Sequence, residues 1–184
     1  WGVHLIDRIV QMNKSKIKQI YCQIINLTGT DVDEGFNLTL VFEDGFIAYI
    51  ESGVGHFDSP TPGWRLNGTT GIGEVITFSG EGAKVLKAKP RDPNFVRDFN
   101  ALPVRKPTIK RGEGSSWFAA PPMNNDAIEL ERPIFDRNAL YRNLVDCIEG
   151  KADQIVTGEQ ALRVLKIMEA ALFSGEKNEF VDFE

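Results

Sequence analysis

The sequence is short of the residues on which most metal and redox sites depend. Its 184 residues include only two histidines, His4 and His56, and two cysteines, Cys22 and Cys147. Neither cysteine stands at metal-ligand spacing from another cysteine or from a histidine. We therefore interpret both cysteines as free thiols buried in a cytosolic protein. No P-loop and no Ser-His-Asp set is recognisable either.

A clustered excess of positive charge and a long apolar run are missing as well. The 26 acidic residues outnumber the 21 basic ones and give a net charge of −5, which argues against a nucleic-acid or anionic-membrane partner. No apolar stretch approaches the roughly 18 residues of a membrane span. The first ten residues carry His4, Asp7 and Arg8 where a signal peptide needs an apolar segment. We therefore predict a cytoplasmic location with no membrane partner.

What is present first is an amphipathic helix. From Trp1 to Met12 the apolar residues recur at helical spacing, but no capping residue lies in the first turn. A helix without a cap usually continues upstream. We therefore expect residues 1–184 to be one α+β domain of a larger enzyme, with Trp1 inside an active-site helix.

The middle of the chain has the period of two that is typical of strands. Asp44-Gly45 predicts a two-residue hairpin turn, and glycines at 68, 71, 73, 80 and 82 are interpreted as turn residues. Together these features predict a mostly antiparallel meander of five or six strands. The expected strands are Ile17–Leu27, Phe36–Phe42, Phe46–Glu51, Trp64–Asn67, Glu74–Phe78 and Ala83–Lys87.

The two faces of this sheet are expected to differ. One face should be buried under helices, and the opposite face is neither fully polar nor fully apolar, which suits packing against another subunit. We assign Phe36, Leu38, Leu40 and Phe42 to the covered face, and Asn37, Thr39 and Val41 with Ile20, Cys22 and Ile24 to the opposite face.

The last third of the chain begins with a proline-rich stretch. Residues 90–133 hold seven of the nine prolines, which excludes a central strand or a long helix there. Asp136 then predicts the start of a helix that ends at Gly150, with Leu140, Leu144, Val145 and Ile148 facing inward. A capping box at Thr157–Gln160 predicts a second helix, ended by Gly175 and followed by a short strand at Phe180–Phe183.

Few residues are candidates for chemistry. His4 and Asp7 lie three residues apart on the first helix, so both side chains project from one face, where a carboxylate can tune a proton-transferring histidine. His56 follows a glycine-rich segment at the end of a strand, where substrate contacts often lie. The stretch Gly68–Gly73 is not interpreted as a dinucleotide loop, because a strand rather than a long helix should follow it.

Several motifs, in order, resemble the glucose–fructose oxidoreductase/inositol dehydrogenase (Gfo/Idh/MocA) family. The opening Trp1–Asp7 resembles the end of its Asp-x-x-x-His-x-x-Asp signature, with His4 and Asp7 at the last two positions. Phe42–Gly45 resembles the family's hairpin, and Trp64–Gly71 resembles its "W-x-L-x-G-x-x-G" stretch. Thr157–Ser174 resembles its final helix. The match covers the C-terminal half of such enzymes.

The resemblance implies the function of a two-domain dehydrogenase. Its C-terminal domain is an open-faced, mostly antiparallel sheet with helices on one face, like those of dihydrodipicolinate reductase and glyceraldehyde-3-phosphate dehydrogenase. An N-terminal Rossmann domain, which this chain lacks, would bind NAD or NADP. The resemblance implies that His4 is catalytic and that Asp7 binds a substrate hydroxyl or orients His4, with His56 as a weaker substrate contact. It also implies a sugar, polyol or related small-molecule substrate and a homodimer or tetramer through the open sheet face.

Two alternatives follow from the same residues. The first is a non-catalytic relative that binds a ligand on the same fold. The second is a stand-alone interaction or dimerisation module that never had a Rossmann partner. The segment upstream of Trp1 distinguishes these possibilities, because an active parent needs the missing aspartate and the cofactor-binding half.

Overall fold

The computed structural model describes residues 1–53, 63–76, 82–87, 127–132, 134–136 and 138–184. The chain divides into two compact units: the first is Trp1–Ser59 with Asp136–Glu184, and the second is Pro60–Phe135. The elements, in chain order, are α1 (Gly2–Met12), β1 (Ile17–Ile25), β2 (Gly35–Phe42), β3 (Ile47–Gly53), β4 (Trp64–Asn67), β5 (Gly71–Val75), β6 (Lys84–Lys87), β7 (Ala127–Glu129), α2 (Ala139–Ile148), α3 (Gly158–Lys177) and β8 (Val181–Asp182).

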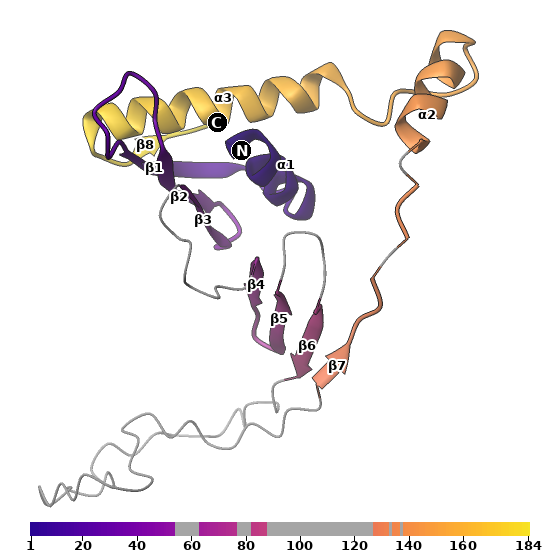
Figure 1. Ribbon diagram of the computed structural model, residues 1–184, viewed down its shortest axis with the longest axis horizontal. Helices are drawn as coiled ribbons and strands as arrows, with labels where there is room; N and C mark the ends of the chain where they lie inside the picture. Colours follow the sequence, from indigo (N-terminus) through magenta and orange to yellow (C-terminus); the bar gives the residue numbers. More distant parts are fainter. Residues whose placement is uncertain (54–62, 77–81, 88–126, 133, 137) are drawn as a thin grey trace, which may run out of the picture. The chain divides into compact units, whose positions relative to one another are not determined.

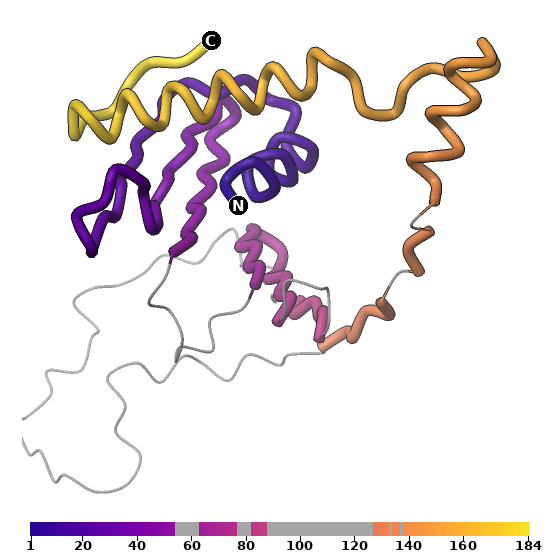
Figure 2. The backbone as a smooth tube through the Cα atoms, turned by 45° about the horizontal axis from the view of Figure 1, so that its top comes forward, coloured from indigo at the N-terminus to yellow at the C-terminus, as the bar shows by residue number. Residues whose placement is uncertain are grey.

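The first unit is built on an antiparallel sheet with the strand order β3-β2-β1-β8. The helix α3 packs on β1, and α1 lies beside α3 and reaches β3, so one face of the sheet is covered by helices (Figures 1 and 2). The predicted α+β class with helices on one sheet face is therefore confirmed. The core consists mainly of Ile6, Ile9, Val10, Ile17, Ile20, Cys22, Leu38, Leu40, Phe42, Ala48, Ile50, Val164, Ile167 and Ala171.

A β-bulge brings Ile17 and Ile20 to the same buried side of β1. Ile17 pairs with Phe42 but Gln19 pairs with Val41, so two residues of β1 span one step of β2. Ile20 then lies opposite Leu40 on the covered face, and Cys22 lies opposite Leu38. The assignment of Ile20, Cys22 and Ile24 to the open face is therefore wrong. Ile20 and Cys22 are core residues, at 0% and 2% exposure.

The open face of this sheet combines polar and apolar side chains. Tyr49 at 78% exposure and Ile47 at 45% are its most exposed large apolar residues. They stand opposite Thr39 and Val41 on β2. On the register, the open face consists of Gln19, Tyr21, Gln23, Asn37, Thr39, Val41, Ile47, Tyr49 and Glu51.

The helix α3 begins as predicted and ends two residues later than predicted. The Thr157 side chain accepts a hydrogen bond from the Gln160 amide, and the Gln160 side chain accepts one from the Thr157 amide, which confirms the capping box. The helix runs past Gly175 to Asn178, whose left-handed φ of 55° closes it. Gly175 has another role: a Cβ there would lie 2.7 Å from Cγ1 of Ile24, so glycine permits the close approach of α3 to β1.

The second unit is a separate antiparallel sheet, β4-β5-β6-β7. The strands predicted as one meander therefore form two sheets, since a period of two identifies strands but not which of them pair. Gly71 and Gly73 lie within β5, where a Cβ on Gly71 would come within 2.5 Å of the Leu86 carbonyl oxygen. Their assignment as turn residues is wrong. A short edge strand, β7, lies in the proline-rich region, beside β6.

A row of alternating charges crosses this second sheet. Arg65, Glu74, Lys84 and Glu129 stand directly opposite one another on the four successive strands. Glu74, whose side chain is only 19% exposed, lies 3.6 Å from Arg65 Nε and 3.2 Å from Lys84 Nζ. Opposite charges on neighbouring strands stabilise one register over its neighbours.

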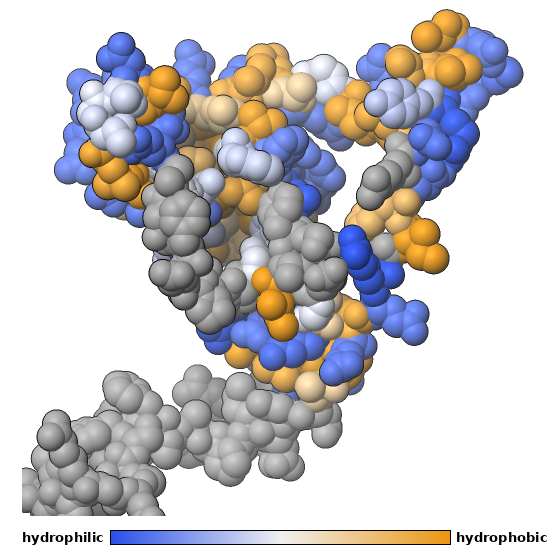
Figure 3. Space-filling view, viewed as in Figure 1, coloured by the Kyte–Doolittle hydropathy of each residue, from blue (hydrophilic) through white to orange (hydrophobic). Residues whose placement is uncertain are grey.

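The apolar face of α2 is exposed rather than directed inward. Leu140, Leu144, Val145 and Ile148 are all at least half exposed, so the prediction that they face a core is wrong. Helical periodicity identifies a face that needs a partner, but not the surface that provides one. Apolar side chains are visible over α2 and α3 in Figure 3. Cys147 on the same helix is half-buried, whereas Cys22 is buried as predicted, and both are free thiols.

Candidate functional site

The helix α1 presents His4 and Asp7 on the side that is turned away from the core. Its buried residues are Ile6, Ile9 and Val10, which fix the rotation of the helix on the sheet. His4 is exposed and Asp7 is half-buried. The ring of Trp1 lies against that of His4, with the two centroids 6.0 Å apart and the planes tilted by 58°. The predicted pair is thus present on one accessible side of α1.

Asp7 is held by a neighbour that the sequence reading did not identify. Gln11 Nε2 donates a hydrogen bond of 2.6 Å to Asp7 Oδ2. In this structure Asp7 is thus oriented by Gln11, while His4 contacts Trp1. The spacing of four residues between Asp7 and Gln11 is the signal that could have revealed the contact, since such pairs meet on a helix surface. Three side chains, His4, Asp7 and Gln11, therefore follow one another along α1.

The start of α1 approaches the sheet closely. A Cβ on Gly2 would lie 3.4 Å from the Phe36 ring on β2. No side chain caps the helix, as the sequence predicted, and its first turn contains no acidic residue. The buried residues Ile6, Ile9 and Val10 hold the rest of the helix, with His4 and Asp7, against the sheet.

His56 lies outside the described residues, and its role stays a prediction. The stretch Gly68–Gly73 runs directly into the strand β5, with the Gly68 amide donating to the Gly71 carbonyl at 2.9 Å. This confirms that it is a hairpin and not the strand-to-helix loop of a dinucleotide site. This stretch therefore does not provide a dinucleotide loop, and the described residues contain no cluster of metal-ligating side chains.

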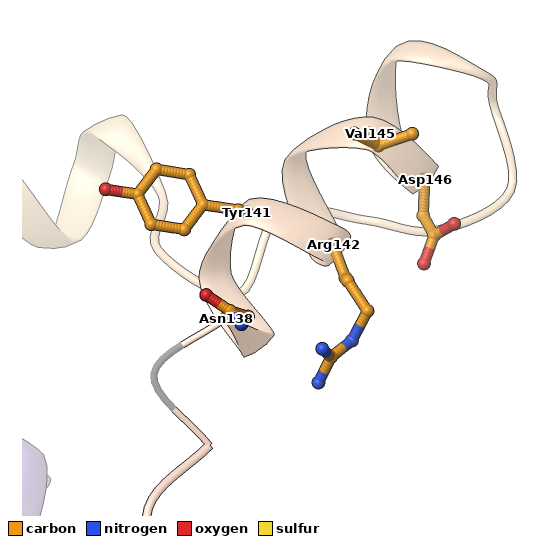
Figure 4. A pocket seen from close by; sticks show the side chains of 5 residues that line it. All are labelled: Asn138, Tyr141, Arg142, Val145 and Asp146. Atoms are coloured by element: carbon orange, nitrogen blue, oxygen red, sulfur yellow. The ribbon is translucent and has the colours of Figure 1, made fainter.

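Two shallow hollows lie elsewhere, and neither includes His4 or Asp7. One, of about 550 Å³, lies at the β4–β5 hairpin between Leu66, Thr70 and Lys87. The other, of about 370 Å³, is formed by residues of α2 alone. Arg142 and Asp146 project from one side of that helix and Tyr141 from another (Figure 4). Because a single helix cannot enclose a ligand, we assign no site to this hollow.

The N-terminal part of the chain matches the model of a known family. Residues 1–74 match the family model of the GFO/IDH/MocA C-terminal domain, which includes α1, the first three strands of the sheet and the β4–β5 hairpin. The resemblance inferred from the sequence motifs is thereby confirmed, and it is a resemblance to the C-terminal domain. None of the described helices is long and apolar enough to cross a membrane.

Solved structures extend this likeness over the whole chain. An NAD-binding protein from Listeria innocua is 26% identical, with a TM-score of 0.74 over 99% of this chain and 46% of its own. An aldose–aldose oxidoreductase from Caulobacter crescentus, complexed with glycerol, is 14% identical, with a TM-score of 0.63 over 99% of this chain and 46% of its own. The WlbA dehydrogenase from Bordetella pertussis, in complex with NADH and UDP-GlcNAcA, is 11% identical, with a TM-score of 0.55 over 100% of this chain and 43% of its own.

This chain thus spans less than half the length of these three proteins. The likenesses below 25% identity establish the fold. No curated protein matches the chain in sequence.

Proposed function

We propose that this chain is the substrate-binding and oligomerisation domain of a two-domain, NAD(P)-dependent oxidoreductase. The parent enzyme would act on a hydroxyl or carbonyl carbon of a sugar, polyol or related small molecule. The observation that carries the proposal is the pair His4 and Asp7 on the exposed side of α1, within the segment matched to the family domain. The oxidoreductases among the solved relatives support the same class of reaction.

The proposed chemistry needs a group that accepts the hydroxyl proton while hydride leaves the same carbon. His4 is the proposed proton carrier, since an imidazole changes charge near neutral pH. Asp7, already oriented by Gln11, is proposed to accept a hydrogen bond from a neighbouring substrate hydroxyl. A bound nicotinamide would supply the hydride acceptor, and its binding residues would belong to the other half of the parent. His56 remains a further candidate for contact with the substrate.

The open face of the first sheet is the proposed subunit interface. Tyr49 and Ile47 expose apolar surface among polar neighbours, a mixture that is usual where subunits meet. A homodimer or tetramer through this face is therefore proposed. A cytoplasmic location is also proposed, because the two free thiols suit a reducing compartment.

Calorimetry with NADH and NADPH tests whether the cofactor is bound by the other half of the parent rather than by this chain. The 184-residue chain should bind neither cofactor at micromolar concentration, whereas the full-length parent should bind at least one of them. A micromolar dissociation constant for the chain alone would contradict the proposed domain assignment. The same titrations would also decide between NAD and NADP in the parent. A parent that binds a cofactor but turns over no hydroxyl substrate would favour the non-catalytic alternative.

A further inference from the structure

Three separate parts of the first unit form hydrogen bonds with the connection between α1 and β1. From the first part, the hairpin turn between β2 and β3, Asp44 accepts a hydrogen bond from the Asn13 side chain, with Nδ2 3.1 Å from Oδ2. Asn13 in turn accepts one from the Ser15 amide at 2.8 Å. The residue that ends α1 is therefore tied both to the turn and to the segment that follows it.

The second part is α3, through Arg163. Its Nη2 donates to the Ser15 carbonyl oxygen at 3.2 Å, and its Nε donates to Oε1 of Glu184 at 3.1 Å. The third part is Glu184 itself, whose Oε2 accepts from the Ile17 amide at 3.2 Å. The Arg163–Glu184 pair thus contacts the connection on both sides of Lys16.

The pair is only about a quarter exposed, at 27% for the Arg163 side chain and 25% for that of Glu184. Partial burial strengthens such an ion pair relative to a surface pair, and each charge also bonds a backbone group. The Ile17 amide lies at the β-bulge, where the regular ladder between β1 and β2 is interrupted. Glu184 provides an acceptor at that irregular position.

We infer that Arg163 and Glu184 are positioning residues, which hold α1, and with it His4 and Asp7, in place through the α1–β1 connection. The anchor acts at the C-terminal end of α1, one turn beyond the buried residues Ile9 and Val10. The importance for catalysis rests on the proposed function, whereas the anchoring itself does not. The reacting groups would remain His4 and Asp7.

Hydrogen exchange on the 184-residue chain tests the anchoring. In Arg163→Met, which keeps an apolar stem but removes the guanidinium, the amides of α1 from Ile6 to Gln11 should exchange about tenfold faster. The exchange rates of the amides of β2 and β3 should change by less than about twofold. Lys166→Met, an exposed substitution on the same helix, is the matched control and should leave α1 unchanged. Equal acceleration throughout the sheet, or no change in α1, would overturn the inference.

Kinetics of the full-length parent separate positioning from general stability. Arg163→Met should lower kcat by about tenfold while the KM for the cofactor stays within about twofold of the original value. An unchanged kcat together with faster exchange in α1 would overturn the catalytic part of the inference. If the parent turns over no hydroxyl substrate, the proposed function fails, and the exchange measurement still decides whether Arg163 anchors α1.

Discussion

The hydroxyl of Ser174 on α3 completes the backbone hydrogen bonding of β1 at Cys22. Ser174 Oγ accepts from the Cys22 amide at 2.9 Å and donates to the Glu179 carbonyl at 2.6 Å. The strand β8 pairs with β1 only at Gln19 and Ile20, so Cys22 lies beyond its reach. Ser174 is fully buried and takes the place of the missing strand partner. It also explains why a serine lies on the otherwise apolar face of this helix.

Replacing Ser174 by alanine should therefore destabilise the domain more than its size suggests. The Cys22 amide would lose its partner in a buried environment, and the part-buried Glu179 carbonyl would lose one as well. We expect Ser174→Ala to lower the free energy of unfolding by about 1–3 kcal/mol, measured by urea denaturation. Glu169→Ala, on the exposed side of the same helix, should change it by less than about 0.5 kcal/mol. Equal values for the two variants would contradict this account of Ser174.

Gly175 should resist substitution for a steric reason. A methyl group there would lie 2.7 Å from Ile24 Cγ1, so α3 would have to move away from β1. We expect Gly175→Ala to lower the free energy of unfolding by about 1–3 kcal/mol in spite of the better helix propensity of alanine. Gly158→Ala is the control, because nothing lies within 4 Å of its added Cβ. A Gly175→Ala variant as stable as the original chain would show that the helix does not pack as closely as described.

Such contacts mark the limit of what the sequence could predict. The α1 helix and the Thr157 capping box follow from local patterns, and both are present. A hairpin also forms at Asp44-Gly45, but its turn is longer than the predicted two residues, because the Phe42 amide bonds the Phe46 carbonyl and leaves Glu43 in the loop. The buried side of β1 was predicted wrongly because it depends on the register between β1 and β2, which the alternation within one strand does not give. The two sheets and the exposed face of α2 depend on pairings between distant segments, which no local pattern contains.

The two thiols should react at very different rates. Burial, with a smaller contribution from Asp33, raises the pKa of Cys22 from 9.0 to about 11. At pH 8 the thiolate fraction of Cys22 is therefore about a hundredfold lower than that of a cysteine with the ordinary pKa. Cys147 is half-buried on a helix with exposed neighbours. Under native conditions iodoacetamide should label Cys147 first, and peptide mapping would identify the site. Labelling of Cys22 at the same rate would show that the contact between β1 and α3 opens readily.

The loop between β1 and β2 should depend on the ionisation of Glu34. The Thr28 hydroxyl, followed by the Leu27 amide 2.7 Å away, lowers the pKa of this carboxyl below its ordinary value. Because the pKa is lower in the folded state, the stabilisation of the loop is present above the ordinary pKa. This stabilisation is lost as the pH falls through the lowered pKa of Glu34. The Leu27 amide resonance should titrate with a midpoint below that of an ordinary glutamate, and Glu34→Gln should abolish the titration. A midpoint at the ordinary value would contradict the described contacts.

The candidate site could be predicted only in part. His4 and Asp7 stand on one helical face, as their spacing required, but the orientation of Asp7 by Gln11 depends on which rotamer each side chain takes. The role of Arg163 could not be predicted from the sequence for another reason. It lies 148 residues from the Ser15 carbonyl that it contacts, and only the fold brings the two together.

The most direct test of the proposed function is the turnover of His4→Ala in the full-length parent. With a hydroxyl substrate and its cofactor, kcat should fall by about a thousandfold, because the proton carrier is lost. Cofactor affinity should stay within about threefold, because that site lies in the other half of the parent. Met12→Ala, an exposed substitution on the same helix, should retain the original turnover. Equal turnover in His4→Ala and the original enzyme would contradict the proposed function.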